Sequence, residues 1–270
     1  MRRIDALWGL LGIALLFPLY SLAQGQPTAS PTPKAAGLFF ATNTPQVSEL
    51  FVSPTAPAAA EKVIYLTFDD GPDSEWTPKV LALLEEHAAV ASFFVVGRCA
   101  GKYAAQTHLI YVAGHCLANH SWDHSSLAGL SKDDFIYQVL STELTLSEVT
   151  PLERKTMPKL LRPPYGEWDA DTADLAFEFG YEIVLWDVDS GDWRSSDVAG
   201  VANQVLDHVQ PGDIVLMHDG GTDRSVSVAA LEIILDQLSA DGWQYEKLCE
   251  HPALDAEIEA SPTATKSQGA

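Results

Sequence analysis

The chain has 270 residues, a hydrophobic content of 47% and a formal net charge of -21 at pH 7. So acidic a composition excludes a nucleic-acid-binding function, because a phosphate backbone needs a basic surface opposite it. It also argues against electrostatic attraction to anionic lipid, and we interpret the charge as a solubility feature.

The first 23 residues have the order of features of an export signal. Arg2 and Arg3 form a basic start, an apolar run covers residues 6–22, and a small-x-small cleavage site ends at Ala23. An uncleaved membrane anchor is the alternative, although the run is short for a bilayer and is interrupted by Pro18. Both interpretations predict an exported protein, secreted or at the cell surface. Membrane contact is expected only for the anchor.

Two further segments have the composition of unfolded chain. Residues 24–60 are rich in Pro, Ala and Thr with almost no charge, and residues 251–270 have the same character. Such segments bury too little apolar surface to offset the entropy of ordering, so we predict a linker and a disordered tail. Residues 61–250 are left as a single folded domain, long enough to build one core.

Within that domain, apolar runs of strand length alternate with amphipathic stretches of helix length. The expected strands are Val63–Phe68, Ser92–Gly97, Cys116–His120, Lys159–Arg162, Ile183–Val188, Asp213–His218 and Trp243–Lys247. The expected helices lie near residues 77–87, 103–113, 133–149, 170–179, 198–209 and 226–240. Several strands are apolar throughout, which favours parallel strands covered on both faces, and the alternation predicts repeated β/α units.

Polar residues of unusual type stand at or just past the ends of five of these strands: Asp69-Asp70, His120, Arg162, Asp189 and His218. In a barrel of parallel strands those ends converge on one face, where active sites are built. A flat doubly wound sheet would instead concentrate them at one switch point. With seven strands rather than eight, we predict an α/β fold, an irregular (β/α)7 barrel.

The first of these motifs, Thr67-Phe68-Asp69-Asp70-Gly71-Pro72, places two carboxylates side by side. Adjacent carboxylates repel unless a cation lies near them, although a simple Asp-containing turn is the alternative. His120 and His124 are spaced so that both imidazoles reach a common point, and two histidines with one carboxylate form a catalytic zinc set. Two surface histidines are the alternative there.

The remaining motifs combine donors, acids and aromatic groups. They are Arg162-Pro163-Pro164-Tyr165-Gly166, Asp189-Ser190-Gly191-Asp192-Trp193 and Leu216-Met217-His218. Each has an ordinary structural alternative: a paired arginine, a capping aspartate, or a histidine at the edge of the core. Five coincidences at the same end of five strands favour a functional set.

Residues 61–250 resemble the polysaccharide deacetylases of carbohydrate esterase family 4, the NodB-homology domain. All five motifs of that family occur in order, as TFDDGP, HSWDH, RPPYG, DSGDW and LMH. The run HDGGTDRSVSVAALEIIL after the last motif is also similar to secreted members of the family.

The resemblance implies a role for each matching residue. Asp70, His120 and His124 would bind one divalent metal ion, and Asp69 would be the general base. Arg162 would hold Asp69, while the backbone N–H of Tyr165 would stabilise the oxyanion. His218 would be the general acid, with Asp189 orienting it. Trp193 and Leu216 would line the pocket for the acetyl methyl group.

These roles predict a metal-dependent hydrolase that removes N-acetyl groups from a cell-wall or chitin-like polysaccharide. An O-acetyl esterase acting on acetylated xylan needs the same residues, and a non-catalytic carbohydrate-binding protein is the alternative from another class. The ligand set suits zinc and tolerates cobalt or manganese.

The three cysteines, Cys99, Cys116 and Cys249, are an odd number, so at least one is unpaired within the monomer. A bridge between Cys99 and Cys116 is disfavoured, because the predicted strands put them near opposite ends of neighbouring strands.

Overall fold

The computed structural model describes residues 62–249, so the predicted signal or anchor, linker and tail lie outside the described residues. Within this range eight short strands form a sheet in which every pairing is parallel. They are β1 (Val63–Asp69), β2 (Ser92–Val95), β3 (Cys116–Asn119), β4 (Leu160–Leu161), β5 (Glu182–Ile183), β6 (Val188–Asp189), β7 (Ile214–His218) and β8 (Gln244–Tyr245).

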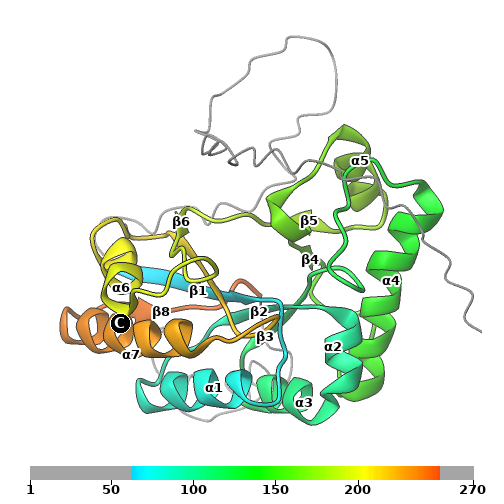
Figure 1. The fold of residues 1–270 in the computed structure, drawn as a ribbon. Helices are drawn as coiled ribbons and strands as arrows, with labels where there is room; N and C mark the ends of the chain where they lie inside the picture. Colours follow the sequence, from blue (N-terminus) through cyan, green and yellow to red (C-terminus); the bar gives the residue numbers. More distant parts are fainter. Residues whose placement is uncertain (1–61, 250–270) are drawn as a thin grey trace, which may run out of the picture. The chain divides into compact units, whose positions relative to one another are not determined.

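The strand order is β5-β4-β3-β2-β1-β7-β6, with β8 paired to the start of β1 (Figure 1). The two ends of this order, β5 and β6, are separated by only four residues of chain. The segment between them therefore connects the two edges of the sheet, which forms an irregular, incompletely closed barrel. The prediction of an irregular (β/α)7 barrel is confirmed.

One predicted strand is wrong in detail. The sequence predicts a single strand over residues 183–188, but β5 pairs with β4 and β6 pairs with β7. Between them, the carbonyl groups of Val184 and Leu185 accept hydrogen bonds from the side chain of Arg162. Because a buried guanidinium takes these acceptors, the carbonyls are not available to a continuous strand ladder.

Seven α-helices lie within the described range, together with the 3-10 turn Pro164–Gly166. They are α1 (Trp76–Glu86), α2 (Gly97–Lys102), α3 (Ala104–Val112), α4 (Lys132–Val149), α5 (Ala170–Glu178), α6 (Val198–Leu206) and α7 (Ser225–Ala240). Six match the predicted helices. Helix α2 was not predicted, because its six residues are too short to show an amphipathic period.

The core lies between the sheet and these helices. Strand β2 and the residues Ile214–Met217 of β7 are buried throughout, as expected for parallel strands covered on both faces. Leu84 of α1 and Leu231 of α7 are among the fully buried side chains that pack against the sheet. No helix between residues 62 and 249 is long and apolar enough to cross a membrane.

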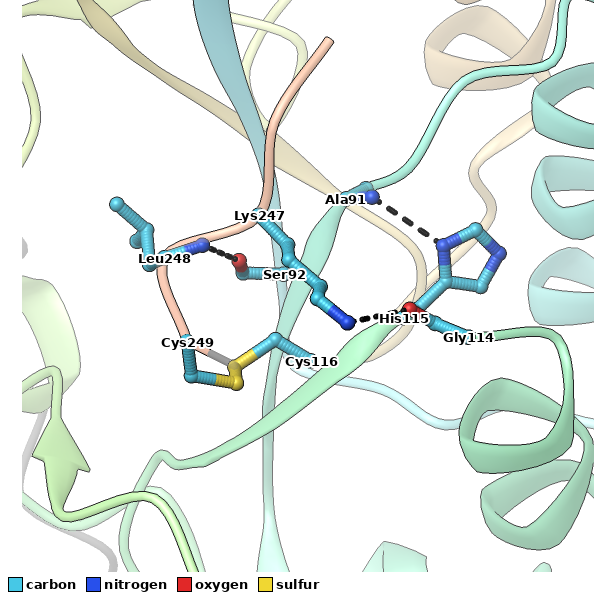
Figure 2. Close-up of a disulfide and its surroundings, with 8 residues drawn as sticks. All are labelled: Ala91, Ser92, Gly114, His115, Cys116, Lys247, Leu248 and Cys249. Atoms are coloured by element: carbon cyan, nitrogen blue, oxygen red, sulfur yellow. Dashed lines mark hydrogen bonds between the residues drawn. A yellow bond between two sulfur atoms is a disulfide. The ribbon is translucent and has the colours of Figure 1, made fainter. Parts of the chain in front are cut away.

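A disulfide ties the amino end of β3 to the segment that follows β8 (Figure 2). Cys116, the first residue of β3, forms a disulfide with Cys249, which follows β8, and the two Cα atoms are 5.8 Å apart. The backbone N–H of Leu248 donates to the hydroxyl of Ser92 at 2.8 Å beside it. Cys99 is the free cysteine, in agreement with the expectation that it does not pair with Cys116.

Candidate active site

The carboxyl ends of the strands bring the predicted motifs to one rim of the barrel. The register of β1 and β7 places Asp69 directly opposite His218. Positive φ angles concentrate here: of five described non-glycine residues with φ above zero, four belong to or flank the predicted motif residues, namely Asp70, Ser121, His124 and Tyr165. Such backbone strain persists where the surrounding structure imposes it, and it gathers at functional sites.

Asp70, His120 and His124 form the cluster predicted as a metal site. One ligand atom from each lies within 4.8 Å of the others. The Nε2 atoms of His120 and His124 lie 3.5 and 3.0 Å from Oδ1 of Asp70. The other ring nitrogen of His120 is 2.7 Å from the carbonyl of Arg162, which fixes the ring so that Nε2 faces the cluster.

The electrostatics of Asp70 fit a cation at this point. Burial by itself would raise the pKa of this carboxyl, but the imidazoles of His120 and His124 outweigh burial and lower the pKa below its ordinary value. Its Oδ1 atom is buried with no aligned hydrogen-bond donor among the described residues. A buried, ionised oxygen without a donor, next to two imidazole nitrogens, is the donor set that a divalent transition metal prefers.

Asp69 is buried and paired with Arg162, as the family resemblance implied. Nη1 of Arg162 donates to Oδ1 of Asp69 at 2.8 Å and to the hydroxyl of Thr67 at 2.8 Å. The guanidinium is fully buried and stacks over the ring of Phe94 at 4.0 Å. Because Arg162 carries a permanent charge and cannot move within the core, it holds Asp69 in one orientation.

The partner of His218 differs from the prediction. Nδ1 of His218 lies 2.8 Å from Oδ1 of Asp192, whose Oδ2 accepts the His218 backbone N–H at 2.9 Å. Asp189 instead accepts a hydrogen bond from the backbone N–H of Gly191. The prediction that Asp189 orients His218 is therefore wrong, because the turn at Gly191 sends the second carboxylate of the motif toward the imidazole.

Asp192 also changes the proton affinity of His218. Burial opposes protonation of the imidazole, but the hydrogen bond and negative charge of Asp192 outweigh it and raise the pKa of His218 above its ordinary value. Since Nδ1 faces Asp192, Nε2 is the nitrogen left to donate a proton.

These groups surround a cavity of about 330 Å³. Trp193 and Leu216 line it, as the family resemblance implied, and Tyr165, Asp189 and Trp186 also line it. The exposed ring of Tyr165 meets that of His124 edge-on, with centroids 4.6 Å apart. The metal cluster, Asp69 and His218 therefore line one space with an apolar wall, while Arg162 and Asp192 hold Asp69 and His218 from buried positions that do not line it.

Comparison with known proteins agrees with this geometry. A sequence profile described as polysaccharide deacetylase matches residues 56–184. A chitooligosaccharide deacetylase of Azorhizobium caulinodans is 32% identical over 196 residues, which cover 68% of this chain and 92% of that protein. The chain belongs to the polysaccharide deacetylase family. Members of this family, carbohydrate esterase family 4, are hydrolases, and the family resemblance of the motifs is thereby confirmed.

Solved structures of the family show the same fold. The Bc1960 peptidoglycan N-acetylglucosamine deacetylase superimposes with a TM-score of 0.66 at 36% identity, covering 72% of this chain and 88% of that chain. A family pseudoenzyme from Bacillus anthracis superimposes with a TM-score of 0.63 at 26% identity, covering 70% of this chain and 64% of that chain. Because one of these neighbours is a pseudoenzyme, the fold alone does not establish activity, which depends on the residues of the site.

Three residues of this deacetylase site received no role from the sequence: Asp192, Asp219 and Arg224. Asp192 belongs to the DSGDW motif, but the spacing of that motif does not show whether Asp189 or Asp192 contacts His218. Asp219 directly follows His218 and is completely buried, with its carboxylate accepting from the hydroxyl of Thr77. Arg224 is buried and donates to Asp70. A basic residue in an otherwise acidic loop was the available signal for Arg224.

Proposed function

We propose that the chain is a metal-dependent deacetylase that hydrolyses N-acetyl groups of an acetylated glucosamine polysaccharide. The observation that carries the proposal is that Asp69, His218 and the metal-ligand cluster line one cavity of about 330 Å³. Amide hydrolysis needs a base for the attacking water and an acid for the leaving amine, in different protonation states. Asp69, which is paired with Arg162, supplies the base. His218, which is paired with Asp192, supplies the acid.

Asp70, His120 and His124 would hold the metal, for which zinc, cobalt and manganese are candidates. A divalent ion bound there would lower the pKa of its water toward neutrality and polarise the acetyl carbonyl. The chain's own residues do the rest. Asp69 accepts the proton of the attacking water, and Arg162 prevents this carboxylate from turning away. His218 then gives its Nε2 proton to the departing amine.

The apolar wall supports an acetyl substrate. Leu216 is buried in strand β7 with its side chain lining the cavity, and Trp193 forms an exposed rim. We infer that these two side chains contact the acetyl methyl group. The backbone N–H of Tyr165, held in a left-handed conformation with φ of 63°, would supply the oxyanion donor.

Substrate class is proposed from the relatives. The Azorhizobium relative is named for chitooligosaccharide and the Bc1960 neighbour for peptidoglycan N-acetylglucosamine. Both substrates carry an N-acetyl group on glucosamine, so we infer that this chemistry is shared. We also propose that the protein is exported. The basic and apolar start of the sequence supports export, as does the Cys116–Cys249 disulfide, which needs an oxidising compartment.

Acetate release by the purified protein tests the function. The substrates are N-acetylchitooligosaccharides, peptidoglycan and acetylated xylan, each assayed before chelation, after chelation, and after addition of zinc, cobalt or manganese. We expect release from the N-acetylated substrates that is lost on chelation and regained with metal. Release from acetylated xylan alone favours an O-acetyl esterase, and full activity of the metal-free protein contradicts metal dependence.

Asp69→Asn tests whether the activity belongs to this site, and Asp174→Asn is its matched control. Both replace a carboxylate by an amide, but Asp174 is exposed on helix α5, away from the cavity. Loss of acetate release in the first with retention in the second ties the activity to this site. No release by the metal-loaded wild type on any substrate supports a non-catalytic carbohydrate-binding protein.

A further inference from the structure

The loop that follows β7, residues 219–224, packs against Asp70. A Cβ atom on Gly220 would lie 2.5 Å from the Asp70 carbonyl oxygen, and one on Gly221 would lie 3.0 Å from Oδ2 of Asp70. Gly221 also has a φ of +86°, a conformation that side chains rarely adopt. The two glycines therefore allow this loop to approach Asp70 more closely than other residues would permit.

Arg224 ends this loop, immediately before helix α7. It is 4% exposed. Its Nη2 donates to Oδ2 of Asp70 at 3.1 Å, and its Nε donates to the carbonyl of Gly220 at 2.6 Å. The guanidinium thus bridges the loop backbone and the carboxylate with two different nitrogens, an arrangement that the planar fork of arginine permits and a single ammonium group does not.

The two oxygens of Asp70 consequently have different surroundings. Oδ2 is held by Arg224, whereas Oδ1 faces His120 and His124 and has no aligned donor among the described residues. A carboxylate held at one oxygen cannot rotate freely, and it presents the other oxygen in a constant direction. We propose that Arg224 is a positioning residue for Asp70, which holds Oδ2 and reserves Oδ1 for a divalent metal.

This inference rests on the proposed metal-dependent function, and it deepens that function by assigning a role to the loop after β7. Loss of a group that orients a metal ligand typically weakens metal affinity about 10- to 100-fold. We therefore expect the zinc dissociation constant of Arg224→Ala to rise by about that factor. Arg224→Lys retains the positive charge but lacks the planar guanidinium group, so its zinc affinity should lie between those of the wild type and Arg224→Ala.

The experiment measures the affinity of the purified full chain for zinc, and for the wild type also for cobalt and manganese, by competition with a chromophoric chelator after removal of bound metal. The variants are Arg224→Ala, Arg224→Lys and Arg224→Met, the last of which fills much of the space without charge. Arg154→Ala is the matched control, because Arg154 pairs with Glu143 and does not line the cavity. Thermal unfolding of each metal-free variant shows whether it is folded.

The outcomes separate the two proposals. Weaker zinc binding by folded Arg224 variants, with Arg154→Ala unchanged, supports the positioning role. If the wild type binds zinc and the folded Arg224 variants bind it equally well, Arg224 is only structural and the inference is overturned, while the proposed function stands. If the wild type binds no zinc, cobalt or manganese, the metal-dependent function fails and the inference fails with it. Should Arg224→Ala not fold, the Lys and Met variants decide the result.

Discussion

The two ends of the barrel strands are built for different purposes. At the carboxyl ends, buried charges, positive φ angles and an unsatisfied carboxylate oxygen gather around one cavity. At the amino ends, Cys116 and Cys249 form a disulfide, and Ser92 accepts the backbone N–H of Leu248 (Figure 2). The two ends of one sheet therefore have different roles. Strained backbone and buried charges form the candidate active site at one end, and a disulfide and hydrogen bonds stabilise the fold at the other.

The sharpest test of the carboxyl-end site is Asp69→Asn. The amide keeps the size of the side chain but cannot accept the proton of the attacking water, so turnover should fall by on the order of 10²–10⁴-fold. Zinc content should stay near that of the wild type, because the three proposed ligands are untouched. Asp70→Ala is the paired variant and should lose zinc. If Asp69→Asn loses zinc and Asp70→Ala retains it, the two roles are reversed.

Removal of the disulfide at the opposite end should change the stability of the protein and leave its catalytic activity unchanged. The disulfide closes a loop with a sequence separation of 133 residues, and its loss in Cys116→Ser/Cys249→Ser should lower the free energy of unfolding by about 2–5 kcal/mol. Denaturant unfolding and acetate release of the same sample check this expectation. Cys99→Ser is the control, since Cys99 is unpaired. A large loss of turnover in a folded disulfide variant would break the division between the two ends.

Asp192→Asn should change the pH dependence of the reaction. The negative charge of Asp192 helps to raise the pKa of His218, so its removal lowers that pKa. A general acid works only below its pKa, and the alkaline limb of the pH profile should therefore move to lower pH. For a pKa of His218 that is lower by about 1, activity on that limb falls about tenfold. Asp189→Asn should leave the limb in place. The reverse result would restore Asp189 as the orienting residue.

Asp219→Asn should give the smallest effect, visible in stability. Burial, followed by the charges of Asp70 and Asp69, raises the pKa of Asp219 to about 7, against 3.8 for an ordinary aspartate. A raised carboxyl pKa favours the folded state at low pH, and this contribution is lost as pH rises from about 4 to about 7. The Asn variant of the metal-free protein should therefore gain about 1–2 kcal/mol relative to wild type between about pH 5 and pH 6. A difference independent of pH contradicts the assignment.

The sequence was informative where the signal is local. Asp69, Asp70, His120 and His218 stand at the ends of apolar strands, and a parallel barrel brings all such ends to one rim. Their residue types in that position indicated a functional set, and two histidines with a carboxylate indicated a metal site, whereas the role of Asp69 as the base came only from the family resemblance. The same local reasoning failed for the strand near residue 184, because its hydrogen-bond acceptors are taken by Arg162, whose motif is 22 residues away.

By itself, then, the sequence determined the α/β barrel and which residues meet at its rim, because strand patterning and strand-end chemistry act over a few residues. Tertiary structure decided which of Asp189 and Asp192 faces His218, since the turn at Gly191 aims the two carboxylates differently. It also decided the partners of Cys249 and Arg224, which lie 133 and 154 residues along the chain from Cys116 and Asp70. Contacts over such separations depend on how loops pack in three dimensions, and no local pattern encodes them.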